Sequence, residues 1–232
     1  PSVISAPGQK PDTFAVAIRD TTRQLRVLSL AGQGRLDEAR KLVASFAGRP
    51  DDLLALLDGL DQVATTTRAS DRRRLGALQL QAAESLDQQR NTLGPANRQR
   101  LDRCLAQAFV AAGFPLRAVA VYERLVKAAP RNWKPRTRLA EVRLAIGTAS
   151  QTQAAITDWR AAERLLPPGS DNWMTVRLGT LRALKQAGQV SECRQLLSVT
   201  RLLYPEKGTA AVRADLKRLA ISLRPKNDRS GM

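Results

Sequence analysis

The residue types best suited to catalysis or metal binding are scarce in this sequence. The chain of 232 residues contains no histidine and only two cysteines, Cys104 and Cys193. Without histidine, neither a Ser-His-Asp triad nor a histidine-containing metal site can form. The two cysteines lie far apart and lack the spacing of a metal-ligand pair. The sequence therefore indicates a protein that is not an enzyme and needs no metal or cofactor.

The paired carboxylates also have structural explanations. Asp51 and Asp52 begin a leucine-rich segment, and we expect them in the first turn of a helix, where acidic side chains suit the helix dipole. Asp58 and Asp61 are expected on the solvated face of the same helix. Residues 32–34, Gly-Gln-Gly, do not match a phosphate-binding loop and are expected to form a turn between helices.

One spacing pattern occurs three times in the second half of the chain. A small residue is followed four positions later by a large apolar residue and twelve positions later by proline: Ala118, Tyr122 and Pro130; Ala155, Trp159 and Pro167; Cys193, Leu197 and Pro205. The small residue lets two helices approach closely, and the large residue fills the space between them. Proline then ends the second helix. The pattern predicts a series of helical pairs.

Glycines mark the other end of each predicted second helix. Gly113, Gly147 and Gly188 each lie just ahead of one, where a glycine can end the preceding helix in the left-handed conformation. Cys193 occupies the small-residue position, so we expect it to be buried. Cys104 falls on a predicted first helix, from which its side chain could face a groove.

These residues make the sequence resemble the tetratricopeptide repeat family. The best copy has residues of the expected type at eight positions: Leu105, Ala106, Phe109, Gly113, Ala118, Tyr122, Leu125 and Pro130. The next copy has Arg143 at the aromatic position and three extra residues between Gly147 and Ala155. An earlier copy of the turn and second helix occupies residues 34–43. The matches cover roughly two thirds of the chain.

The resemblance implies an all-α fold, a right-handed α-solenoid of about five helical hairpins plus a C-terminal capping helix. Residues 51–97 form a divergent pair in this interpretation, and residues 208–223 form the cap, which gives about eleven helices. We expect a flexible N-terminal segment at 1–11, a repeat domain at 12–223 and a flexible tail at 224–232. Because Pro1 is not an initiator methionine, we expect this chain to be part of a longer protein.

The net charge is strongly positive. The chain has 38 basic and 21 acidic residues, a formal charge of +17, and residues 98–150 alone hold 11 basic residues against 3 acidic ones. A neutral solvated surface needs charges of both signs interspersed. The excess in the central repeats is consistent with an anionic partner and equally with solvated helix faces, since charge on exposed helix positions is normal.

The resemblance also implies where a partner would bind. First helices of this family line the concave face, and the positions that commonly meet a ligand are here Arg100, Arg103, Gln107, Lys134, Arg138, Glu141, Arg182 and Lys185. The implied groove is basic and would hold an acidic peptide or protein. Lys134 and Arg138 match the lysine and arginine of the carboxylate-clamp type, whose asparagines are absent here.

Three functions stay open on these grounds. The first is a protein-interaction scaffold with a basic concave groove, the second a nucleic-acid-binding helical repeat, and the third a structural spacer between domains. Single-strand binding needs exposed aromatic platforms, and most aromatics here occupy packing positions or helix starts, which leaves Phe114 in a turn. This favours the scaffold. No apolar run is long enough to span a membrane, and the compartment and oligomeric state stay open.

Overall fold

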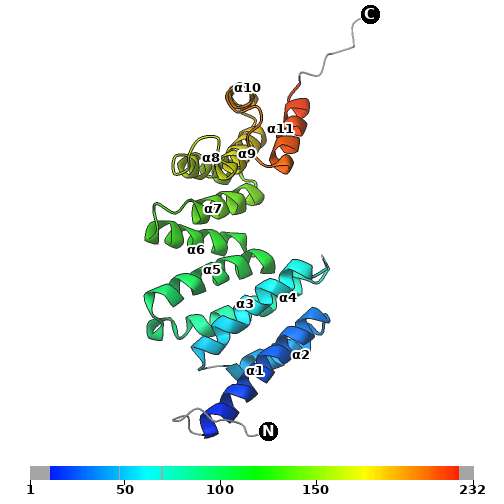
Figure 1. Cartoon of the computed structure of the whole chain (residues 1–232), viewed down its shortest axis with the longest axis vertical. Coiled ribbons are helices and arrows are strands. Elements are labelled where there is room, and N and C mark those ends of the chain that lie inside the picture. Colours follow the sequence, from blue (N-terminus) through cyan, green and yellow to red (C-terminus); the bar gives the residue numbers. More distant parts are fainter. Residues whose placement is uncertain (1–10, 47, 69, 225–232) are drawn as a thin grey trace, which may run out of the picture. The chain divides into compact units, whose positions relative to one another are not determined.

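The structure, a computed structural model, describes residues 11–46, 48–68 and 70–224, with side chains from residue 21 on. All regular secondary structure in these residues is helical, with no strand (Figure 1). The α-helices are α1 (Pro11–Gly32), α2 (Leu36–Val43), α3 (Pro50–Thr66), α4 (Arg72–Asp87), α5 (Pro95–Ala112), α6 (Pro115–Ala128), α7 (Trp133–Ile146), α8 (Ala149–Glu163), α9 (Asp171–Gln186), α10 (Val190–Leu203) and α11 (Ala210–Ser222). Two short 3₁₀ helices, Ala44–Phe46 and Arg90–Thr92, follow α2 and α4. The predicted all-α fold with about eleven helices is confirmed.

The chain forms two compact units, Pro1–Arg117 and Ala118–Met232, whose boundary in the sequence falls inside α6. The predicted terminal segments, 1–11 and 224–232, lie outside the described residues except for the first residue of α1 and for Arg224. The single repeat domain at 12–223 stays a prediction. No helix in the described ranges is both long and apolar enough to cross a membrane.

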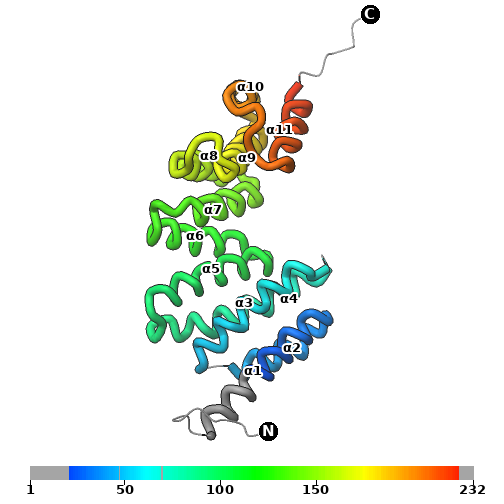
Figure 2. The backbone as a smooth tube through the Cα atoms, viewed as in Figure 1, coloured from blue at the N-terminus to red at the C-terminus, as the bar shows by residue number. Residues whose placement is uncertain are grey.

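In the first unit, helices alternate between two rows (Figure 2). Gln24 of α1 donates a hydrogen bond to the carboxylate of Asp52 on α3 at 3.1 Å, so first helices are neighbours. Arg40 of α2 donates to Gln81 of α4 at 3.1 Å, so second helices are neighbours too. The leucines of α3 fill the space between the rows and are buried, as expected: Leu53, Leu54, Leu56, Leu57 and Leu60.

The second unit repeats this alternation. Gln186 of α9 donates to the Leu144 carbonyl of α7 at 2.9 Å, and α9 is linked in turn to α11. In the other row, Gln189 at the start of α10 donates to Gln153 of α8 at 3.2 Å. First helices α7, α9 and α11 therefore form one row, and second helices α8 and α10 form the other.

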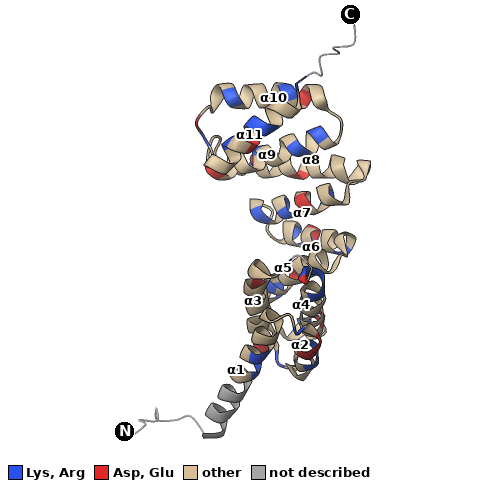
Figure 3. Ribbon diagram, turned by 90° about the vertical axis from the view of Figure 1, so that its right-hand side faces the viewer, with Lys and Arg blue, Asp and Glu red and all other residues tan. Residues whose placement is uncertain are grey.

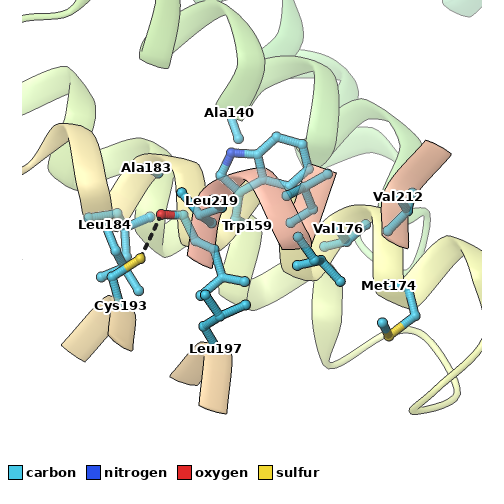
Figure 4. Close-up of a cluster of buried hydrophobic side chains, with 14 of the residues drawn as sticks. Ala140, Trp159, Met174, Val176, Ala183, Leu184, Cys193, Leu197, Val212 and Leu219 are labelled. Atoms are coloured by element: carbon cyan, nitrogen blue, oxygen red, sulfur yellow. Dashed lines mark hydrogen bonds between the residues drawn. The ribbon is translucent and has the colours of Figure 1, made fainter. Parts of the chain in front are cut away.

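The repeated small and large residues lie where the sequence predicts. The small ones are fully buried and the large ones are at most 5% exposed: Ala118, Ala155 and Cys193, then Tyr122, Trp159 and Leu197. The Cys193 thiol donates to the Leu181 carbonyl of α9 at 3.2 Å (Figure 4). All three predicted cap glycines have positive φ, at 89°, 76° and 74° for Gly113, Gly147 and Gly188. The predicted packing register is confirmed.

Candidate functional site

The predicted site residues of the first unit all lie on α5. Arg100 forms an ion pair with Asp58 of α3, and its guanidinium also reaches the Leu54 carbonyl at 3.5 Å. Arg103 and Gln107 are exposed. Asp58 is exposed, as expected, and its ion pair with Arg100 means that α3 partly neutralises the positive charge of α5.

Two neighbouring groups are more buried than the sequence suggests. Asp61 is half-buried and accepts a hydrogen bond from Gln79 at 2.8 Å. Burial raises the pKa of its carboxyl, while the charge of Arg103 acts in the opposite direction. Cys104 is only 4% exposed, and burial raises the pKa of its thiol to about 11. Cys104 therefore packs in the interior, as a lone helical thiol most often does, and does not face a groove; a protonated buried thiol is a poor nucleophile.

The predicted residues of the second unit lie on α7 and α9. Lys134 is exposed in the first turn of α7. Arg138 donates to Glu141 at 2.7 Å, one turn further along the same helix. Arg182 and Lys185 lie one turn apart on α9 and both reach α11. Arg182 donates to Asp215 at 2.6 Å, and Lys185 donates to Ser222 at 2.9 Å.

Two adjacent grooves run along the first helices of this unit. The α7–α9 groove has a volume of about 370 Å³ and is lined by Glu141, Leu144, Ala145, Trp159, Thr175, Leu178, Gly179, Arg182 and Gln186. The α9–α11 groove has a volume of about 770 Å³ and is lined by Arg182, Lys185, Gln186, Asp215, Arg218, Leu219 and Ser222. Arg182 and Gln186 belong to both. We call the two grooves together the first-helix face.

The first-helix face contains some of the predicted site residues and not others. It brings together Glu141, Arg182 and Lys185. Lys134 and Arg138 line neither groove. Arg100 and Arg103 belong to the first unit, so a single groove that joins them to Lys134 and Arg138 stays a prediction.

Helix α11 contributes charged residues to this face that are absent from the predicted site. Asp215 accepts hydrogen bonds from both Arg182 and Arg218. The signal was present, since Asp215, Arg218 and Ser222 follow one another at helical spacing. Only the apolar stripe of this helix was considered, because the helix was interpreted as a cap. Basic residues recur on every helix of the second unit (Figure 3).

Comparison with known proteins identifies the fold. Searched by sequence, the chain matches no protein-family model and no curated protein. Among solved structures it resembles BtubC (BKLC) from P. vanneervenii, with 16% identity, a TM-score of 0.55 and coverage of 86% of this chain and 82% of that one. It also resembles TTC0263, a thermophilic TPR protein of Thermus thermophilus, with 14% identity, a TM-score of 0.50 and coverage of 87% and 99%.

The helical pairs are divergent tetratricopeptide-like repeats. In a tetratricopeptide-like stack each pair contacts its neighbours, and the extended concave surface serves for binding. Helices α7, α9 and α11 are the first helices of three successive tetratricopeptide-like units. The first-helix face runs along these three helices.

Proposed function

We propose that this chain is a non-catalytic protein-interaction scaffold, and that the first-helix face binds an acidic segment of a partner protein. The α9–α11 groove carries this proposal. Arg182, Lys185 and Arg218 line this groove together with a single carboxylate, that of Asp215, which leaves an excess of two positive charges.

The chemistry of the lining favours a peptide with both acidic and apolar side chains. Arginine can hold a carboxylate through two parallel hydrogen bonds, and Arg182 and Arg218 are 55% and 76% exposed. The neighbouring α7–α9 groove has an apolar floor that includes half-buried Leu144 and the buried residues Leu178 and Trp159. An apolar side chain next to the acidic ones would therefore find a matching surface.

Nucleic-acid binding is the weaker alternative. Among residues 21–224, whose side chains the structure describes, Phe114 is the only aromatic residue of the exposed large apolar set, at 47%. The guanidinium of Arg117 lies 5.6 Å from its ring centre. Single-strand binding relies on successive stacking platforms, and one aromatic does not provide a row. A spacer role between domains is the remaining alternative.

The test measures binding of a fluorescein-labelled Glu- and Leu-rich peptide to the chain by fluorescence anisotropy. A double variant, Arg182→Glu with Lys185→Glu, should weaken binding by more than about tenfold, because each charge-assisted hydrogen bond contributes about 1.5–3 kcal/mol. The double variant Lys127→Glu with Arg131→Glu, at two exposed residues outside both grooves, reverses the same number of charges, is the matched control and should leave binding unchanged.

Two results would contradict the proposal. One is equal binding of the peptide to the double variant and the parent chain. The other is tighter binding of a random-sequence single-stranded RNA, with affinity that falls steeply with salt, which would favour the nucleic-acid alternative.

A further inference from the structure

Within the row formed by the second helices of the pairs, α10 has a neighbour on one side only, α8. On that side, α8 holds it through an ion pair between Arg160 and Glu192 and through the hydrogen bond between Gln153 and Gln189. On the other side, α10 is tied to α11 by Arg194, whose guanidinium donates to the Leu223 carbonyl at 2.7 Å. In the part of the chain that the structure describes, no further second helix lies beside α10 on the side opposite α8.

A groove lies at that open place. The α10–α11 groove has a volume of about 520 Å³ and includes Leu202 and Tyr204 near the end of α10 and the buried side chains of Met174 and Leu216. Leu202 is 80% exposed, more than any other large apolar residue among those whose side chains the structure describes, from residue 21 on. An exposed leucine at the mouth of an apolar-floored groove is suited to contact a partner.

The rim of this groove is basic, and its positive charges outnumber the carboxylates that could pair with them. Four cations line it against one carboxylate, that of Glu206: Arg201, Lys207, Arg213 and Lys217. Arg213 donates to the backbone carbonyls of Glu206 and Gly208, at 3.3 and 2.6 Å. Within residues 21–224, no carboxylate pairs with Arg201, Lys207 or Lys217.

The α10–α11 groove has more unpaired positive charge than the first-helix face. There, Arg182 and Arg218 already share Asp215. In the α10–α11 groove the excess is three positive charges, four against one. A ligand carboxylate that arrives at Lys217 or Arg201 displaces no protein carboxylate, so its full charge complementarity is available for binding.

We propose that the α10–α11 groove is a docking site for an amphipathic, acidic helix of a partner protein. The helix would lie beside α10 in the position that α10 itself takes beside α8. Its apolar residues, spaced three and four positions apart, would contact Leu202 and Tyr204, and its flanking Asp and Glu residues would face the basic rim. Helix-in-groove recognition uses this combination of apolar anchors and a charged rim. The inference does not depend on the first-helix face.

The experiment uses a synthetic peptide of 14 residues, the length of α10, with Leu on one helical stripe and Glu on both sides of it. A scrambled peptide of the same composition is the ligand control. Fluorescence anisotropy with the whole chain should show binding of the patterned peptide and not of the scrambled one. Circular dichroism should show that the patterned peptide gains helicity on binding.

Substitutions in the groove test whether the peptide binds there. Leu202→Asp and Lys217→Glu should each weaken binding by about tenfold or more, and neither should unfold the chain, since both side chains are exposed. Ile221→Asp is the matched control for Leu202→Asp, because Ile221 is 62% exposed on α11 and does not line the groove. It should leave binding unchanged.

Other outcomes would overturn the proposal. Equal binding of patterned and scrambled peptides would remove it, as would unchanged binding in the Leu202→Asp variant. Loss of binding only in the Arg182→Glu, Lys185→Glu double variant would assign the peptide to the first-helix face. Self-association of the chain that Leu202→Asp abolishes would assign the groove to a second copy.

Discussion

Replacing Gly179 by alanine tests the packing of α8 against α9. Gly179 is buried in the middle of α9, and an added Cβ would lie 2.6 Å from Cε2 of Trp159 and 2.7 Å from two further carbons of the same ring. Trp159 is only 5% exposed, and Ala140 lies beside the same ring (Figure 4). The indole therefore has little room to move away, and the new methyl group overpacks the contact.

Two opposing terms set the magnitude. Alanine improves on glycine in a helix interior by about 0.5–1 kcal/mol. Overpacking of a well-packed core costs about 1–3 kcal/mol. The unfolding free energy of the second unit should therefore fall, by about 1 kcal/mol as a central value.

Gly59 provides a matched control in the first unit. It also lies inside a helix, α3, and its added Cβ would lie 2.6 Å from a terminal methyl of Leu28. Leu28 is half-buried, and the end of its side chain can rotate away from the new methyl group. Gly59→Ala should thus keep the propensity gain and stabilise the first unit by up to about 1 kcal/mol.

Urea unfolding followed by circular dichroism and tryptophan fluorescence measures both changes. The three ring atoms nearest to Gly179 belong to the six-membered ring of the indole, so Trp159→Phe should relieve the clash. In a double-mutant cycle, Gly179→Ala should lower the free energy of unfolding by less in the Trp159→Phe variant than in the parent chain. Additive effects in the cycle, or equal changes for Gly59→Ala and Gly179→Ala, would refute the packing argument.

Two further predictions concern buried ionisable groups. Burial raises the pKa of the Glu163 carboxyl, although Thr180 donates a hydrogen bond to it and the Arg177 guanidinium lies 3.0 Å away. The folded state therefore keeps this proton to a higher pH than the unfolded chain does. The free energy of unfolding then falls as the pH rises from the unfolded pKa of about 4.3 through the raised folded pKa. Glu163→Gln should flatten that fall when urea midpoints are compared between about pH 4 and about pH 8, and an unchanged slope would refute the assignment. Because the thiol pKa of Cys104 is about 11, iodoacetamide at about pH 8 should label this residue only after unfolding; rapid labelling of the native chain, detected by mass spectrometry, would contradict its burial.

The packing of the repeats could be predicted because it is encoded locally. A small residue, a large one a turn later and a proline fix how two consecutive helices meet, as at Ala155 and Trp159, which are both buried. The cap glycines are local signals too, because a helix that ends in the left-handed conformation favours glycine. Such features need only the helical period and no knowledge of distant neighbours.

The electrostatics of the candidate site could not be predicted in the same way. Arg100 and its partner Asp58 are 42 positions apart, and their pairing depends on how two first helices align side by side. Counting charges along the sequence gives the net charge of a segment, but it does not identify the ion-pair partner of each basic residue. Cys104 shows a second limit, since one residue corresponds to about 100° around a helix. That rotation separates the buried thiol from the exposed Arg103 next to it.

If the α9–α11 groove binds an acidic segment as proposed, Asp215 makes binding there an exchange of one carboxylate for another. Its carboxylate already accepts hydrogen bonds from Arg182 and Arg218, so a ligand carboxylate at the same place gains only the difference between two similar contacts. A neutral segment gains nothing there, because Asp215 is the better acceptor for both arginines. A segment with one acidic residue roughly breaks even, and a net gain requires a second carboxylate that reaches Lys185, whose present partner is the neutral hydroxyl of Ser222. The resident aspartate thus sets a threshold in ligand charge, and selectivity comes from the number of acidic residues rather than from the presence of one.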